Sequence, residues 1–278
     1  MARHPLTLAQ AADELGVHYM TVYRYVRTGR LPATRVGGTW EVARADLALV
    51  RRGAAGVRRG TAAGARVSRA GLERRLVAGD EAGAWGLIEA ALASDMTPES
   101  VLLELVAPAM RAIGEGWADG ALSIADEHRA SGVAIRLISR LGARFARRGV
   151  KRGTVVLAAP AGELHAAPVA IAANLLRWKS FEVVELGADT PAEALAETVA
   201  AEPDTVAVAL ACTTDAADRS ARLAITALRR STPEVPVLLG GAAIADAAHA
   251  RRLGADSFTG ASADEVVRAV EAIVTAVP

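Results

Sequence analysis

The sequence predicts a multidomain chain with a small winged helix-turn-helix, then a four-helix bundle, then a Rossmann-like (flavodoxin-like) α/β domain with a five-stranded parallel sheet. Three observations predict this order. The first 68 residues contain eleven arginines and four acids, whereas the remaining 210 contain 21 bases and 27 acids. Helical periodicity then runs through residues 69–149. Over 150–278, short apolar runs alternate with Ala-rich helical stretches, which is typical of a parallel sheet covered by helices.

Composition excludes several classes of protein. With 52% hydrophobic and 23% charged residues, the chain is too apolar to be disordered. No apolar run approaches the roughly 20 residues that cross a bilayer, and the first residues lack the apolar core of a secretory signal. Cys212 is the only cysteine, so an internal disulfide and a thiolate zinc site are both excluded. We therefore expect a cytoplasmic protein with no membrane partner.

The basic head has the pattern of a helix-turn-helix. Thr7 is a suitable N-cap for a first helix that ends near Leu15, and Gly16-Val17 makes a short turn. A second helix is expected over about 18–28, and the second helix of such a pair fits the major groove of DNA. The side chains expected to reach phosphates or bases from this helix are Tyr19, Thr21, Arg24 and Arg27.

A hairpin signal follows the two helices. Gly37-Gly38 separates short β-branched runs, and glycine tolerates the positive φ of a tight turn. The combination resembles the winged helix-turn-helix of the excisionase and MerR-like superfamily. The resemblance implies that residues 1–52 bind double-stranded DNA, with Arg35, Gly37 and Gly38 in the wing. A helical protein-interaction module and a solubilising basic tail are the alternatives. Residues 53–68 are expected to form a flexible basic linker.

Residues 69–149 are expected to form four helices. The first two are separated at Gly79, and Thr97-Pro98 opens the third with a cap and a proline at the first helical position. Pro108 is expected to bend the third helix, and Ser123 to cap a fourth that runs towards Arg147. Four helices with short connections indicate a bundle.

The α/β domain, residues 150–278, is expected to bind its ligand beyond the carboxyl ends of its strands. Five strands are expected, at about 154–159, 181–186, 205–210, 235–239 and 256–259. The loop after the first of them carries Glu163 and His165, and this histidine is one of only five in the chain.

Three short motifs in this domain resemble those of cobalamin-binding domains. Those domains carry Asp/Glu-x-His-x-x-Gly after the first strand, Ser-x-Leu/Thr at the third and Gly-Gly after the fourth; here the corresponding residues are 163–168, 211–213 and Gly240-Gly241. The resemblance implies that His165 is the lower axial ligand of cobalt and that Glu163 bonds its far ring nitrogen. It also implies that Thr213 and the two glycines shape the space for the nucleotide tail. Two positions depart from the pattern, Pro168 for glycine and Ala211 for serine.

The bundle carries a second resemblance. Trp117 is followed by nine residues and then by Glu127-His128, an arrangement similar to that of the CarH/LitR-type photoreceptor regulators. This resemblance implies that the cofactor is adenosylcobalamin and that these three side chains surround its adenosyl group. Ala118 stands where the best-known members have a histidine that can bind cobalt after illumination. The alternative is a core tryptophan with a surface Glu-His pair.

Together the resemblances imply a non-enzymatic transcriptional regulator. In such a protein, adenosylcobalamin would assemble a DNA-binding dimer or tetramer in the dark, and light would release the operator. A regulator that senses cobalamin without light is an alternative. A corrinoid carrier for methyl transfer would explain His165 and the bundle but not the basic head. A cobalamin mutase is disfavoured because no residues remain for a (β/α)₈ barrel.

Overall fold

The computed structural model of the chain describes residues 5–15, 17, 19–27, 31–36, 39–47, 68–214 and 216–276. Contacts divide the chain into two units, one of residues 1–90 with 108–133 and one of residues 91–107 with 134–278. Each unit is described by itself. Among the described residues, no helix combines the length and the apolar content needed to cross a bilayer.

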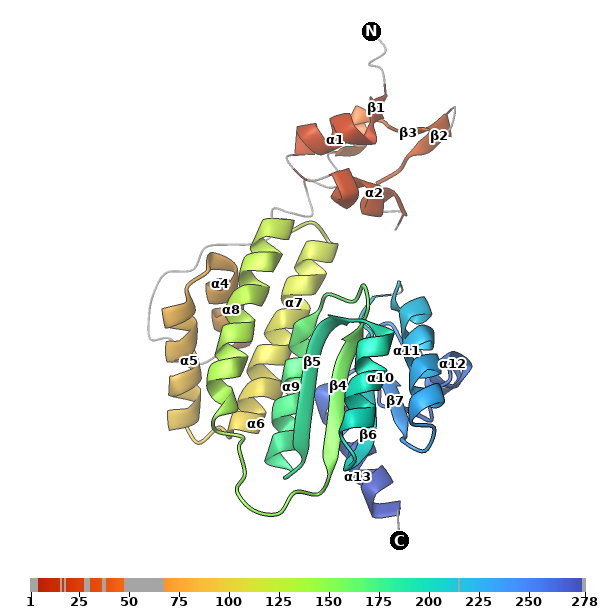
Figure 1. Cartoon of the computed structure of the whole chain (residues 1–278). Helices are drawn as coiled ribbons and strands as arrows, with labels where there is room; N and C mark the ends of the chain where they lie inside the picture. The colour runs from red at the N-terminus through yellow and green to blue at the C-terminus, as the bar shows by residue number, and fades with distance from the viewer. Residues whose placement is uncertain are drawn as a thin grey trace. The chain divides into compact units, whose positions relative to one another are not determined.

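The N-terminal domain is a helix-turn-helix with a three-stranded antiparallel sheet (Figure 1). Its elements are β1 (Leu6–Thr7), α1 (Leu8–Leu15), α2 (Tyr19–Arg27), β2 (Thr34–Val36), β3 (Thr39–Val42) and a 3₁₀ turn (Arg44–Asp46). The expected N-cap is present, because the Thr7 hydroxyl accepts from the Gln10 N–H at 3.3 Å and the Gln10 side chain accepts from the Thr7 N–H at 3.0 Å. The strand at residues 6–7 was not expected; it pairs with Glu41 and Val42.

The hairpin predicted as a wing is present. Strands β2 and β3 pair antiparallel with Arg35 opposite Trp40, while Gly37 and Gly38 lie outside the described residues. Val22 and Tyr25 of α2 are buried with Leu8 and Val42, so one side of α2 faces the core of this domain. The predicted linker, apart from Ser68, also lies outside the described residues.

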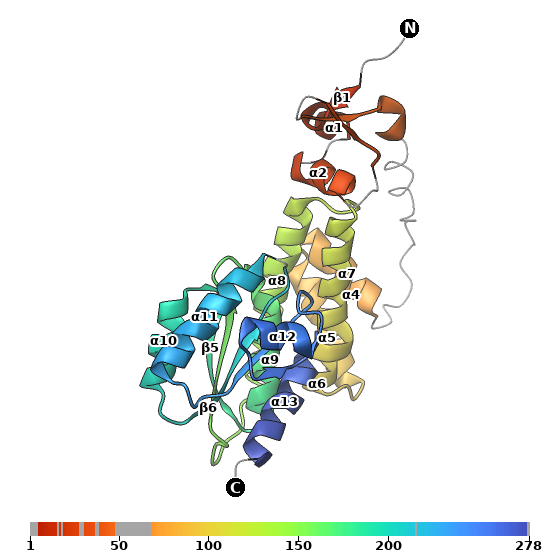
Figure 2. The same cartoon turned by 90° about the vertical axis from the view of Figure 1, so that its right-hand side faces the viewer.

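The helical region begins after Ser68, whose hydroxyl caps the first helix by accepting from the Gly71 N–H. It consists of α4 (Arg69–Ala78), α5 (Glu81–Ala93), the single turn α6 (Pro98–Ser100), a π-helical segment (Val101–Val106), α7 (Ala107–Ala118) and α8 (Ile124–Gly142). Figures 1 and 2 show α4, α5, α7 and α8 side by side as a bundle.

Two details of these helices differ from expectation. The turns at Val101–Val106 are π-helical and end two residues before Pro108, which has no N–H to donate and whose ring crowds the preceding turn. The expectation that the fourth helix runs towards Arg147 was wrong, because α8 ends at Gly142. Phe145 then turns inward, fully buried, and meets the Trp178 ring edge-on at a centroid distance of 6.0 Å.

The C-terminal domain is the predicted five-stranded parallel sheet, in the order β5-β4-β6-β7-β8. Its strands are β4 (Thr154–Pro160), β5 (Glu182–Thr190), β6 (Thr205–Ala211), β7 (Val237–Gly240) and β8 (Ser257–Phe258). Every residue of β4 is buried, as expected for a central strand covered on both faces. Helices α9 (Ala166–Trp178) and α13 (Ala263–Ala276) pack together on one face. The other face is covered by α10 (Ala192–Ala201), α11 (Ala217–Ser231) and α12 (Ala247–Leu253).

Candidate functional site

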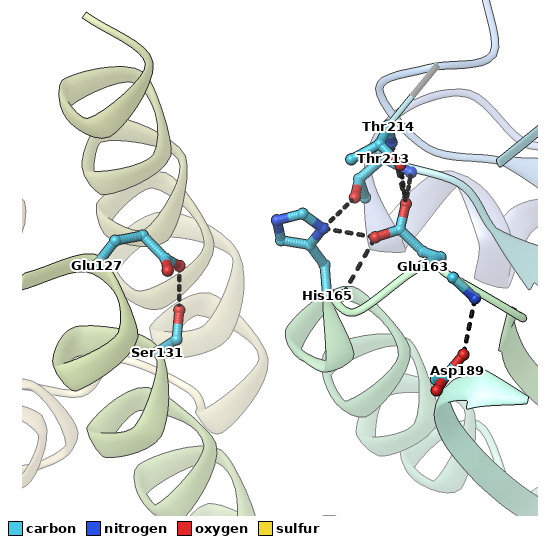
Figure 3. Close-up of polar contacts among 8 residues, drawn as sticks. Glu127, Ser131, Glu163, His165, Asp189, Thr213 and Thr214 are labelled. Carbon is cyan, nitrogen blue, oxygen red and sulfur yellow. Dashed lines mark hydrogen bonds and ion pairs between the residues drawn. The ribbon is translucent and has the colours of Figure 1, made fainter. Parts of the chain in front are cut away.

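The candidate site lies where the strand order of the sheet reverses. Strand β4 is followed by α9 on one face of the sheet, and its neighbour β6 is followed by α11 on the other. Open parallel sheets bind ligands at such a switch point, beyond the carboxyl ends of the strands. The loops after β4 and β6 carry Glu163, His165, Thr213 and Thr214, and Figure 3 shows these four side chains gathered together.

Backbone contacts fix the loop after β4. The Glu163 N–H donates to the Pro160 carbonyl at 2.9 Å, and the Asp189 N–H donates to the Glu163 carbonyl at 2.9 Å. The Asp189 carboxylate in turn accepts from the Gly162 N–H at 2.7 Å. Asp189 has a φ of +53°, a left-handed conformation that aspartate tolerates better than most residues. These contacts from the end of β5 hold the loop that carries Glu163 and His165.

Glu163 is the buried centre of the cluster, with a fully buried side chain. One carboxylate oxygen accepts from the N–H groups of Thr213 and Thr214, at 2.7 and 3.0 Å, and from the Thr214 hydroxyl at 3.2 Å. The other oxygen lies 2.5 Å from His165 Nδ1 and accepts from the His165 N–H at 3.1 Å. Burial alone would raise the pKa of Glu163, but the hydrogen bonds from His165 and Thr213 outweigh it and lower the pKa from 4.5 to about 2.

The carboxylate sets the tautomer of His165. Because Glu163 is ionised and 2.5 Å from Nδ1, that nitrogen carries a proton, and a neutral ring then has its lone pair on Nε2. The Thr213 hydroxyl lies 2.8 Å from the same Nδ1 and holds the ring from a second side. The ring is 45% exposed, and Figure 3 shows Nε2 pointing away from Glu163 and the threonines. This arrangement prepares the imidazole to act as a metal ligand through Nε2.

The ionised state of Glu163 predicts a pH dependence of stability. A carboxyl group whose folded pKa of about 2 lies below its ordinary value of 4.5 stabilises the fold above pH 5 and loses this effect as the pH falls towards 2. The shift corresponds to about 3 kcal/mol in the free energy of unfolding. We expect the difference between wild type and Glu163→Gln to shrink over this range in urea unfolding of the apoprotein. Glu185→Gln, which removes an exposed partner of Arg177, is the control. Parallel pH curves for wild type and Glu163→Gln would contradict this role.

The packing of the protein itself requires both Gly240, the last residue of β7, and Gly241, which follows it. Gly241 has a φ of +110°, and a Cβ there would lie 2.1 Å from the Cys212 carbonyl oxygen. A Cβ on Gly240 would lie 2.0 Å from the Thr259 hydroxyl oxygen and 2.6 Å from the Gly260 carbonyl oxygen. The sequence interpretation attributed these glycines to approach of a nucleotide tail. The structure adds close packing of the loops after β6, β7 and β8 as a reason for them.

Cys212 directly precedes Thr213 and Thr214 in the chain and is fully buried. Burial, together with the negative charges of Glu163 and Asp218, raises the pKa of its thiol from 9.0 to about 12. Such a thiol is unreactive at neutral pH, so Cys212 serves as a small packed side chain.

The residues singled out in the helical region occupy the end of α7 and the first turns of α8. Trp117 is partly buried and next to last in α7, and Ala118 is its exposed last residue. Glu127 is 16% exposed and lies 2.7 Å from Nδ1 of His128, whose side chain is 71% exposed. Sequence reasoning missed Ser131, whose hydroxyl donates to Glu127 at 2.6 Å (Figure 3). Its spacing four residues after Glu127 on a helix was the available signal.

Of the predicted DNA-contacting residues, Tyr19 at the start of α2 is 45% exposed, and Arg35 is exposed on β2. Thr21, Arg24 and Arg27 lie on α2 as expected, but their side chains are outside the description.

Three protein families match the chain in consecutive segments. A helix-turn-helix domain family matches residues 5–54, and two families described as B12 binding domains match residues 69–142 and 153–270. The HTH-type transcriptional repressor CarH of Myxococcus xanthus is 36% identical over 151 residues, which are 53% of this chain and 49% of the repressor. The chain thus carries, in this order, one segment similar to a helix-turn-helix domain and two segments similar to B12 binding domains.

The chain spans about half the length of this curated relative. Its fold also resembles the monomethylamine corrinoid protein of Methanosarcina barkeri, with a TM-score of 0.63 and 18% identity, over 72% of this chain and 96% of that one. A cobalamin-binding protein from Desulfitobacterium hafniense is 22% identical with a TM-score of 0.41, over 75% of this chain and 99% of that one. The first of these likenesses supports the fold assignment of the bundle and the sheet.

Proposed function

We propose that this chain is a non-enzymatic transcriptional regulator that binds adenosylcobalamin and double-stranded operator DNA. The observation that carries the proposal is the His165 ring, half exposed at the switch point of the sheet and held at Nδ1 by a buried carboxylate. An imidazole in this tautomer has a lone pair on Nε2 that could bind the cobalt of a corrin. The residues present therefore fit cobalamin, and the helix-turn-helix match supports DNA as the second partner.

Each domain has a role in this proposal. Residues 1–52 would bind DNA, residues 53–68 would connect, and residues 69–149 and 150–278 would each supply side chains that hold the cofactor. His165 would bind the cobalt through Nε2, with Glu163 holding the proton on Nδ1 and Thr213 steadying the ring. Gly240 and Gly241 would leave room for the nucleotide tail, whose fit would also depend on Pro168 and Ala211.

The helical residues are assigned to the adenosyl group. When bound, adenosylcobalamin supplies a Co–C bond that light can break, which is a property of the cofactor itself. Trp117 offers a flat apolar face for an adenine ring. Glu127 is held by Ser131 and His128 and has further lone pairs that can accept hydrogen bonds from ribose hydroxyls. Ser131 thus acts as a positioning residue for Glu127.

Regulation requires that cofactor and DNA favour the same state of the chain. We assign that state to a dimer or tetramer, because one short helix-turn-helix usually needs a second copy to read two half-sites. Loss of the adenosyl group would remove its contacts with Trp117 and Glu127 and so lower the preference for the assembled state. Ala118 cannot bind cobalt, so a bis-histidine adduct cannot form from this position, and we assign the lit state a cofactor that exchanges readily.

Two other functions make different predictions. A light-independent cobalamin sensor would use the same geometry at His165 but would not respond to illumination. A corrinoid carrier is favoured by one observation, the likeness of fold to the Methanosarcina corrinoid protein. It would require neither the basic head nor any effect of DNA.

The deciding experiment uses the full chain loaded with adenosylcobalamin in the dark. Its visible spectrum, its mass by light scattering and its affinity for selected operator DNA are measured before and after green illumination. We expect photolysis, a smaller assembly and loss of DNA binding. Photolysis without a change in mass or DNA affinity would favour the light-independent sensor. Absence of specific DNA binding in both states would exclude a regulator.

Replacing Trp117 tests the cap. Trp117→Ala should reduce the preference of the protein for adenosylcobalamin over hydroxocobalamin by about fivefold or more, since one aromatic contact is worth about 1 kcal/mol beyond the area that it buries. The His165 spectrum should be retained, and Trp117→Phe should restore part of the preference. Competition titration of the apoprotein measures this. An unchanged preference in Trp117→Ala would remove Trp117 from the site.

A further inference from the structure

The second unit carries a strongly basic surface segment. Residues 134–162 contain seven bases and no acid, and five of these bases fall within residues 144–152. Residues 143–153 connect the end of α8 to the start of β4 (Figure 1), so these five bases lie at the amino end of the strand whose carboxyl end precedes His165. The seven residues of β4 separate the two ends by roughly 20 Å.

The end of α9 adds two further bases to this surface. The Arg147 guanidinium stacks 3.7 Å from the centroid of the Trp178 ring, and the Arg152 guanidinium lies 4.6 Å from that of Phe181. Arg152 also donates to the Lys179 carbonyl at 3.5 Å. Two segments that are distant in sequence therefore form one surface, which we call the basic ridge. Its members are Arg144, Arg147, Arg148, Lys151, Arg152, Arg177 and Lys179.

The charge of the basic ridge is only partly neutralised. Three of its bases pair with acids: Lys151 with Glu182 at 3.7 Å, Arg152 with Glu271 at 2.8 Å, and Arg177 with Glu185 at 3.1 Å. Within the described part of the chain, Arg144, Arg148 and Lys179 form no ion pair. Apart from the seven bases of the ridge, residues 134–278 contain nine bases and sixteen acids, so the ridge is a local positive surface on an otherwise acidic unit.

The chemistry of the ridge fits a polyanion backbone. Five of its seven bases are arginines, whose planar donor groups match phosphate oxygens. Stacking on Trp178 fixes the Arg147 guanidinium by its face and leaves its edge for hydrogen bonding. Val150 is the one large apolar side chain recorded as exposed in residues 144–152, so the surface lacks the apolar centre of a typical protein interface. Interfaces with DNA are polar and positively charged in this way.

We propose that the basic ridge binds the phosphate backbone of duplex DNA as a second, sequence-independent contact in addition to the helix-turn-helix. This inference rests on the DNA-binding function proposed above. It predicts that a duplex long enough to reach beyond the recognition site is bound with a steeper salt dependence than a short one. The reason is that each neutralised phosphate contributes about 0.9 to the slope of log affinity against log salt.

The test uses the full chain, loaded with adenosylcobalamin in the dark, and duplexes of about 20 and about 60 base pairs that share one selected operator, lengths chosen from the span of two half-sites. The variant Arg144→Gln/Arg148→Gln/Lys179→Gln removes three ridge charges. The control Arg219→Gln/Arg222→Gln/Arg230→Gln removes three exposed charges from α11. We expect the ridge variant to lower the slope on the long duplex by about 2 to 3, and the control by less than 1. An unchanged cofactor spectrum verifies that the ridge variant is folded.

The other outcomes separate the two proposals. One outcome is that the salt slopes of the ridge variant and the control are equal while Arg24→Gln/Arg27→Gln still weakens DNA binding. That result would overturn the proposed DNA contact at the basic ridge but leave the proposed regulator function standing. A ridge variant with a changed mass in light scattering and an unchanged slope would also overturn it, because the surface would then contact protein. DNA binding that none of these variants weakens, or no DNA binding at all, would instead overturn the proposed function.

Discussion

Replacing His165 with alanine is expected to weaken cobalamin binding by about 100-fold or more, because the protein loses its only proposed bond to cobalt. Removal of a residue that merely orients a metal ligand already costs 10–100-fold, and loss of the ligand itself should cost at least as much. The visible spectrum of any cofactor that remains bound should lose the features of an axial imidazole. Equilibrium dialysis and absorbance measure the two effects.

Added imidazole provides the rescue control. In the His165→Ala protein it can enter the vacated position and should restore the axial-nitrogen spectrum in part. His249→Ala is the matched histidine control, since His249 lies on α12 and pairs with Asp218 of α11 at 3.0 Å. Full retention of cofactor with an unchanged spectrum in His165→Ala would exclude this residue as the ligand.

Gly241→Ala is expected to destabilise the α/β domain by about 3 kcal/mol or more, even without cofactor. The new Cβ would lie 2.1 Å from the Cys212 carbonyl oxygen, in a backbone with a φ of +110°, so both a clash and backbone strain oppose it. The clash is with the backbone of Cys212, which cannot move aside as the end of a flexible side chain could. Urea unfolding of the apoprotein measures the change.

Gly149→Ala separates strain from collision. Gly149 has nearly the same φ, +112°, but a Cβ there meets nothing within 4 Å. This variant should therefore cost only the conformational strain, roughly 1 kcal/mol. Equal losses in the two variants would mean that the packing of the loops after β6 and β7 adds nothing to the requirement for glycine at 241.

The sequence was sufficient to predict the fold because local signals agreed with tertiary structure. The β-branched run at 154–156 lies in the centre of a parallel sheet, and Thr97-Pro98 caps a helix as expected. The sequence predicts too long a fourth helix because residues 143–148 are themselves compatible with a helix. Its end is decided by burial of Phe145 against Trp178, which lies on another element.

The candidate site was predictable to the extent that its motifs are local. Glu163 and His165 are two residues apart, and the structure confirms that they touch. Thr214 was missed because its bond to Glu163 joins positions 51 residues apart, and local spacing says nothing about such a pair. The structural need for Gly241 was also missed, since it depends on the course of the neighbouring loop at Cys212.

Burial of Cys212 gives the chain a native reporter of local opening. With a thiol pKa of about 12, roughly one molecule in ten thousand would carry a thiolate at pH 8. Modification by a thiol reagent therefore needs the loop after β6 to swing away and expose the sulfur. The same loop donates two main-chain N–H groups to Glu163, so any ligand that steadies His165 should slow the labelling of Cys212. The rate at which Cys212 is alkylated should therefore report how much ligand is bound at His165, and no engineered cysteine or dye is needed.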